Sequence, residues 1–141
     1  MRIMGPNGPI GEAIPIHGFT HEIISPRDPA SGLPTGKRQH KPFVITKELD
    51  KSTPLIFQAL TRNEILPAVE LRFLQTGTTG REVRYFTIEL KNASIAGVQM
   101  QNQTGQAVET REHVSFVYEK IIWTYVDGGI TAEDDWEAPV S

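Results

Sequence analysis

Apolar and polar residues alternate along four stretches of the chain, and this alternation predicts β-strands with one buried face. The stretches cover residues 43–48, 69–73, 86–90 and 114–123. In the first of them, Lys47 shares a side with Phe43 and Ile45. In the last, Ile122 is expected to face the core and Ile121 to face away from it.

One helix is predicted, and its start is marked clearly in the sequence. Thr53 is a favourable N-cap residue, and Pro54 suits the first helical position. Apolar residues between positions 55 and 60 fall on one face, and the helix is expected to end near Asn63. Farther along, Gly77–Gly80 has the composition of a hairpin turn, and Gly97 is expected to bend its strand.

The first part of the chain is rich in proline and glycine. Residues 2–4 are expected to form a short edge strand, followed by a turn at 5–8 and a second strand at 14–24. Residues 25–41 form the longest predicted loop, with three prolines, two glycines and no apolar periodicity. Loops of this length inside compact domains usually serve a function. A polar loop at 101–112 and an acidic tail at 127–141 complete the prediction.

Together these elements predict a mainly β fold, a small antiparallel β-barrel of two packed sheets with one flanking α-helix. The length of 141 residues fits a single domain over positions 1–141. A domain of this kind must close a barrel, cover its sheet edges or pair those edges with other copies.

Composition narrows the set of partners. The formal net charge is -3, so charge gives no reason to expect nucleic acid or an anionic membrane as a partner. The absence of cysteine excludes disulfides, thiolate nucleophiles and cysteine-ligated zinc. The first residues contain no apolar run suited to a signal peptide, and no stretch approaches the ~20 apolar residues of a membrane span. We therefore expect no membrane insertion and, if the protein leaves the cell, export without a cleaved signal.

Two patterns suggest ligand binding at first sight. Gly32–Arg38 resembles a phosphate-binding loop, but its spacing is one residue short, the Ser or Thr after Lys37 is missing, and no helix is predicted to follow. His17 and His21 lie four residues apart, which on a strand separates them by about 13 Å. That distance is too long for one metal ion, so we predict surface or interface histidines, no metal and no cofactor.

Adjacent carboxylates occur at Asp134 and Asp135. Neighbours in a strand point to opposite faces, whereas a glycosidase needs two carboxyl groups across one cleft. The prediction is an acidic turn packed around Trp136. Because the sequence also lacks Gly-x-Ser-x-Gly, no catalytic residue is assigned and the chain is predicted not to be an enzyme.

Several segments resemble, in order, those of the Hcp family, the inner-tube proteins of type VI secretion systems. The resemblance covers nearly the whole chain. It depends on the segments occurring in the same order, because no single motif is diagnostic of the family. The second predicted strand matches more loosely. The resembling segments are HKPFVITKELDKSTP (40–54), YFTIELKNA (85–93), YEKIIWTY (118–125) and DDWEAP (134–139).

The resemblance implies a barrel similar to the tail-tube subunits of contractile phages. It implies hexameric rings that stack into a hollow tube, which a contracting sheath expels from the cell. Small effector proteins in the lumen, and the spike, sheath and baseplate proteins, are the implied partners. The implied route starts in the bacterial cytoplasm and ends outside the cell.

Three contact surfaces follow from this interpretation. Residues 25–39 of the long loop are expected to contact the next ring. Thr20 and Glu22 of the second strand are expected to face the lumen, because that strand changes from apolar to polar along one side. Edges of the second strand and of the long last strand are candidates for pairing between neighbouring subunits. The expected ring-stacking residues are Arg27, Asp28, Leu33, Lys37 and Arg38.

Other interpretations remain open. A tail-tube protein of a phage or of an extracellular contractile injection particle needs the same stacked ring. A carbohydrate-binding β-sandwich would use aromatic residues as a platform, and a small hydrolase would use acidic residues with a histidine. The candidate residues of the carbohydrate-binding platform are Trp123, Tyr125 and Trp136. Those of the hydrolase are Asp134, Glu137 and His113.

Overall fold

A computed structural model describes residues 1–102 and 110–136. Within them, one antiparallel sheet runs in the order β2-β1-β7-β8-β9-β6-β3, and β10 branches from it by pairing with β9. A separate two-stranded sheet joins β4 (Ile23–Ile24) to β5 (Gln39–His40). The strands of the large sheet are β1 (Arg2–Gly5), β2 (Gly8–Gly11), β3 (Gly18–Thr20), β6 (Phe43–Glu48), β7 (Leu66–Thr76), β8 (Glu82–Asn102), β9 (Thr110–Tyr125) and β10 (Ile130–Asp135).

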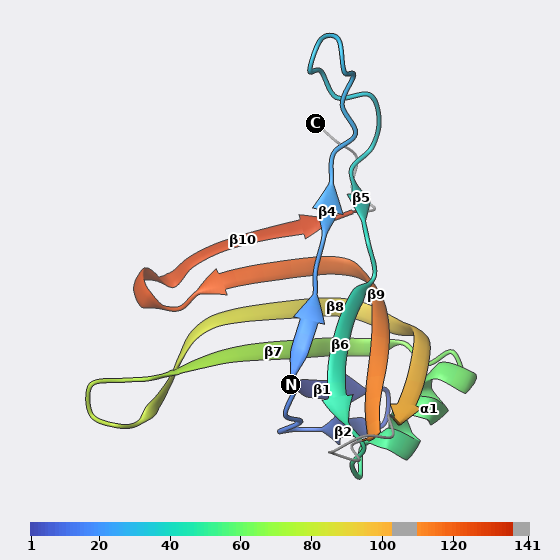
Figure 1. The fold of residues 1–141 in the computed structure, drawn as a ribbon, viewed down its shortest axis with the longest axis vertical. Helices are drawn as coiled ribbons and strands as arrows, with labels where there is room; N and C mark the ends of the chain where they lie inside the picture. The colour runs from blue at the N-terminus through green and yellow to red at the C-terminus, as the bar shows by residue number, and fades with distance from the viewer. Residues whose placement is uncertain (103–109, 137–141) are drawn as a thin grey trace.

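The long strands β8 and β9 bend, so that one part of the sheet lies across the other (Figure 1). The register of the β8–β9 pair shifts between Ile95 and Gly97, which is the bend expected at this glycine. The mainly β fold with packed layers is confirmed, but the expected closed barrel is not formed. Among the described strands, no pairing joins β3 to β2, so the sheet stays open.

The core fills the space between the layers. The strand alternations correctly place its largest members, and Phe43, Phe116, Leu71 and Leu90 are all fully or almost fully buried. The prediction for the last strand is wrong at two neighbouring residues, because Ile121 is buried and Ile122 is only partly buried. Near these residues Asn92 of β8 has a φ of 48° and donates a hydrogen bond to Glu119, 3.0 Å away.

Helix α1 (Thr53–Thr61) packs on β8 through Ile56 and Ala59. Its N-cap is Ser52 and not Thr53, because Thr53 is already the first helical residue; the Ser52 side chain makes no capping hydrogen bond. Leu55 is 42% exposed, so it does not share the buried face as expected. The helix ends as predicted, with Asn63 in the left-handed region at a φ of 51°. No helix in the described part of the chain is long and apolar enough to cross a membrane.

Both ends of the chain differ from the prediction. β1 is an inner strand that pairs with both β2 and β7, so the edge is β2. The predicted strand at 14–24 breaks into β3 and β4. The acidic tail contains β10, which follows the 3-10 helix η1 (Asp127–Gly129) and pairs with β9 along its full length. Part of the predicted loop at 101–112 and the end of the tail lie outside the described residues.

Candidate assembly interface

The predicted long loop is a hairpin that projects away from the sheets (Figure 1). We call residues 23–40 the arm; it consists of β4, β5 and the segment between them. Backbone hydrogen bonds join its two legs at the base, from Lys41 N to Glu22 O (3.0 Å), and near the tip, from Thr35 N to Pro26 O (2.9 Å). An isolated bridge also pairs Arg27 with Pro34. The arm is therefore an ordered projection and not an irregular loop.

The tip of the arm is closed by Asp28. Its carboxylate accepts hydrogen bonds from Ser31 Oγ at 2.7 Å and from Ala30 N at 3.2 Å. These bonds hold the pKa of Asp28 below its usual value. Gly32 takes a φ of 72° next to this turn, a conformation that favours glycine. Asp28 thus shapes the tip, while the nearby Leu33 is 65% exposed.

The expected ring-stacking residues fall into two groups. Arg27 and Leu33 are exposed near the tip of the arm, and Lys37 is exposed on the leg that returns to β5. Arg38 lies at the base, where its Nε donates to Asp134 Oδ2 at 2.6 Å and its side chain also donates to the Asp135 carbonyl at 2.8 Å. The segment 32–38, which resembles a phosphate-binding loop, also lies on the arm. The chain continues from it into β5 and not into a helix.

His40 completes the base of the arm. Its ring is 3% exposed, and its Nε2 lies 2.6 Å from Asp134 Oδ2. The hydrogen bond from Arg38 lowers the pKa of Asp134 against the effect of burial, and His40 adds to the lowering. The partners His40 and Asp134 are 94 residues apart, so no local spacing in the sequence could indicate this contact. Asp134 therefore binds two residues of the arm. It lies in the strand β10 and not in the expected acidic turn.

The other leg is anchored by His21. Its Nε2 accepts a hydrogen bond from Trp123 Nε1 at 3.1 Å, and its ring packs on Phe43 with 5.0 Å between centroids. Burial lowers the pKa of His21, and the nearby His40 lowers it further, which favours the neutral ring that this hydrogen bond requires. His17 makes a separate contact with Glu48 at 3.1 Å. No group of three or more potential metal ligands gathers within residues 1–102 and 110–136.

The residues expected to face the lumen are both exposed. Thr20 ends β3 opposite Val44, and Glu22 follows on the way to β4. Phe19 contacts Phe43 and Phe73, at centroid distances of 5.7 Å and 5.3 Å. Because side chains alternate along a strand, Thr20 points to the opposite side from these aromatic rings.

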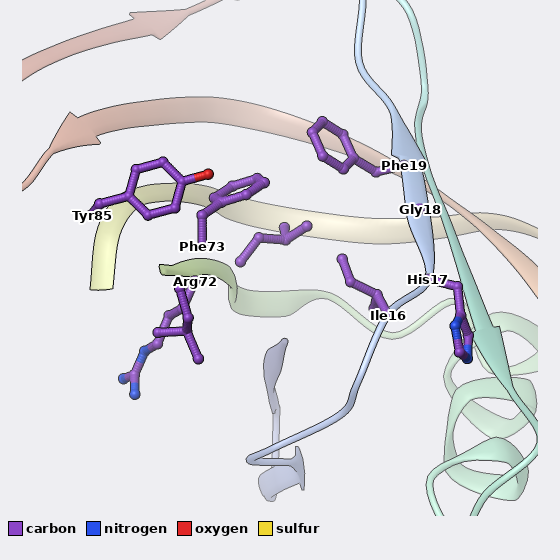
Figure 2. Close-up of a pocket in the computed structure, with 9 residues that line it drawn as sticks. Ile16, His17, Gly18, Phe19, Arg72, Phe73 and Tyr85 are labelled. Atoms are coloured by element: carbon purple, nitrogen blue, oxygen red, sulfur yellow. The ribbon is translucent and has the colours of Figure 1, made fainter. Parts of the chain in front are cut away.

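A groove of about 280 Å³ separates β3 from β7. Figure 2 shows Phe19 on one side of it and Phe73 and Tyr85 on the other. Beyond the three residues that pair with β1, the outer edge of β7 has no partner among the described strands, and neither has the outer edge of β3. Strand edges of this kind are templates for pairing with another chain.

The residues considered for a carbohydrate-binding platform or a hydrolase do not gather at one site among the described residues. The indole N–H of Trp136 donates to the carbonyl of Tyr118, and that of Trp123 donates to His21. Tyr125 is 47% exposed. His113 lies 3.1 Å from Thr46 Oγ1, whereas Asp134 binds the arm. Glu137 lies outside the described residues.

An open sheet with unpaired edges, an aromatic groove and a projecting hairpin are features suited to a protein that assembles with other chains. Comparison with known proteins agrees. The family described as "Type VI secretion system effector, Hcp" matches residues 10–125. The Major exported protein of Pseudomonas aeruginosa strain PAO1 is 44% identical over 135 residues, which cover 92% of this chain and 78% of that protein.

Solved structures of this family share the fold. A crystal structure of an Hcp protein has a TM-score of 0.89 at 32% identity and covers 96% of both chains. The secreted protein Hcp3 from Pseudomonas aeruginosa has a TM-score of 0.78 at 31% identity, covering 97% of this chain and 96% of that one. The chain belongs to the Hcp family of type VI secretion system proteins, a family of exported structural proteins.

Proposed function

We propose that this chain is a subunit of the type VI secretion inner tube and forms hexameric rings that stack into that tube. The observation that carries the proposal is the arm, an ordered hairpin that projects from the sheets of an Hcp-family protein. A hairpin kept in order by its own hydrogen bonds, yet extended into solvent, is suited to contact another molecule.

The outer part of the arm supplies the contact with the next ring in this proposal. Leu33 offers an apolar anchor at the tip, Arg27 offers positive charge close to it, and Lys37 offers positive charge farther down the leg that returns to β5. Asp28 supports the contact by fixing the turn. Arg38 acts at the base, since Asp134 and the Asp135 carbonyl engage its side chain.

Within a ring, we propose that a neighbouring subunit occupies the groove between β3 and β7. The unpaired edges supply backbone hydrogen bonds, and Phe19 supplies an aromatic anchor that is 45% exposed. Phe19→Glu is expected to weaken ring association by roughly 2 kcal/mol or more, as for a central aromatic anchor. Native mass spectrometry across a dilution series measures this effect. Leu55→Glu on α1, with a similar 42% exposure, is the control, and an unchanged ring for Phe19→Glu contradicts the proposal.

Thr20 and Glu22 line the lumen in this proposal, where small effector proteins are held. An arginine at position 20 adds bulk and charge to that surface. Thr20→Arg is therefore expected to keep the mass of the ring and to reduce effector retention in co-purification. Thr79→Arg, at the exposed turn between β7 and β8, is the control. Full retention by the Thr20 variant would place the lumen on a different face.

The remaining partners follow from the same proposal. The tube is built in the bacterial cytoplasm, contacts the spike, sheath and baseplate proteins, and leaves the cell when the sheath contracts. Its work is mechanical, with residues 1–141 acting as one tube domain without cofactor or catalysis. Binding of glycans by a stable monomer would instead favour the carbohydrate-binding interpretation.

Native mass spectrometry with negative-stain imaging of the same sample tests the proposal directly. A ring of six with a central hole, and stacks of such rings at high concentration, are the expected results. A chain that stays monomeric at high concentration would contradict the proposal.

A further inference from the structure

The strand β10 ends directly beside the base of the arm (Figure 1). It pairs with β9 from Ile130 opposite Tyr125 to Asp135 opposite Lys120, so its last residues are held firmly in the sheet. We propose that β10 braces the arm, and that Asp134 is the positioning residue that fixes the direction in which the arm leaves the sheets. This inference rests on the proposed function of the arm in ring stacking.

One carboxylate oxygen joins two residues of the same leg. Asp134 Oδ2 lies 2.6 Å from Arg38 Nε and 2.6 Å from His40 Nε2. The carbonyl of Asp135 accepts a further hydrogen bond from Arg38. Asp134 fixes the leg that contains Arg38 and His40. Because His40 pairs with Ile23 of β4, the other leg is held in place as well.

The ring of His40 connects the brace to β9. Its Nδ1 lies 2.8 Å from the hydroxyl of Tyr118, while its Nε2 faces Asp134. Burial raises the pKa of Tyr118 to about 12, and the charge of Asp134 contributes, so this hydroxyl keeps its proton. The two contacts are satisfied together when Tyr118 donates to Nδ1 and Nε2–H donates to Asp134. Arm, β9 and β10 therefore meet at a single histidine.

The hydrogen bonds between the two legs order the arm internally, but they do not fix its direction relative to the large sheet. β4 and β5 have only two residues each, and a short two-stranded hairpin is marginally stable in water. Charge-assisted hydrogen bonds from arginine to a carboxylate are strong and directional. They can hold a short hairpin at a fixed angle, which a contact between stacked rings requires in every subunit.

The test compares Asp134→Asn with Glu133→Gln. Both changes replace a carboxylate by an amide on β10, but Glu133 is paired with Lys120 at 3.1 Å and, as the strand neighbour of Asp134, points to the opposite face of β10. The chain has no cysteine, so Ala30→Cys at the tip and Lys51→Cys near α1 can carry spin labels. Labelled chains are diluted with unlabelled chains so that most rings hold one labelled copy, and the distance distribution is then measured.

Asp134→Asn is expected to broaden that distribution and to raise the protein concentration needed for stacking by roughly tenfold or more, as for loss of a charge-assisted hydrogen bond. Ring mass stays unchanged, and Glu133→Gln behaves like the wild type. If Asp134→Asn does not fold, Arg38→Gln tests the same contact from the arm. An equally narrow distribution with unchanged stacking overturns the brace. If the wild type does not stack, the proposed function fails, and the distance distributions alone decide the brace.

Discussion

Lys47→Met is expected to lower the free energy of unfolding by about 3–5 kcal/mol, the range for breaking a buried ion pair from one side. Lys47 and Glu112 are both fully buried, and Lys47 Nζ lies 3.2 Å from Glu112 Oε1. The same ammonium group lies 3.1 Å from Asp50 Oδ1 and donates to the carbonyl of Glu48. Its removal leaves the charge of Glu112 in the core without compensation.

The pair joins three elements. Lys47 is on β6, Glu112 is on β9, and the hydroxyl of Thr53, at the start of α1, donates to Glu112. The second carboxylate oxygen of Glu112 is buried and has no hydrogen-bond partner among the described residues. A charge that is already partly unsatisfied depends strongly on its cation, which is why the expected loss is large.

Urea denaturation of Lys47→Met and of the exposed control Lys51→Met measures this loss. The control is expected to stay within about 0.5 kcal/mol of the wild type. The double variant Lys47→Met, Glu112→Leu is expected to recover much of the stability, because an apolar pair of similar volume needs no compensation. A Lys47→Met protein as stable as the wild type would contradict the role of the pair.

A shortened arm is expected to give rings that no longer stack. In this variant Asn-Gly replaces residues 28–33, so the legs close directly on the bridge between Arg27 and Pro34. The change removes Leu33 and the turn built by Asp28, but it leaves Arg38 and His40 on the brace. Ring formation should survive, because the groove between β3 and β7 is unchanged.

Sedimentation velocity and negative-stain imaging compare stacking at equal protein concentration. Native mass spectrometry checks that the ring is intact, and a thermal melt checks the fold. Leu33→Ser gives a graded variant with the arm at full length, and it is expected to reduce stacking without abolishing it. Tubes as long as those of the wild type in the shortened variant would show that the arm does not carry the contact.

Elements with a local pattern can be predicted from the order of the residues alone. Alternation located the strands around Phe43, Leu71, Ile88 and Phe116, because a two-residue period is a property of one strand alone. The prediction of a helix start at Thr53–Pro54 is one residue late, because α1 begins at Thr53 itself, and the turn at 77–80 is confirmed; both signals are local. The same alternation puts Lys47 on the side of Phe43 and Ile45, and the structure shows that this side is buried.

Contacts between residues that are distant in the sequence become visible only in the folded chain. Glu112 is 65 positions from Lys47, and Asp134 is 96 positions from Arg38, so neither pair leaves a local pattern. β10 was missed because it is exposed on both faces and paired along one edge, which removes the alternation that marks a half-buried strand. The sequence predicts a loop where the structure has the arm, because the order of the arm comes from backbone hydrogen bonds between its legs, and these do not depend on apolar periodicity. The open sheet likewise depends on which edges meet in space, a property that no single strand contains.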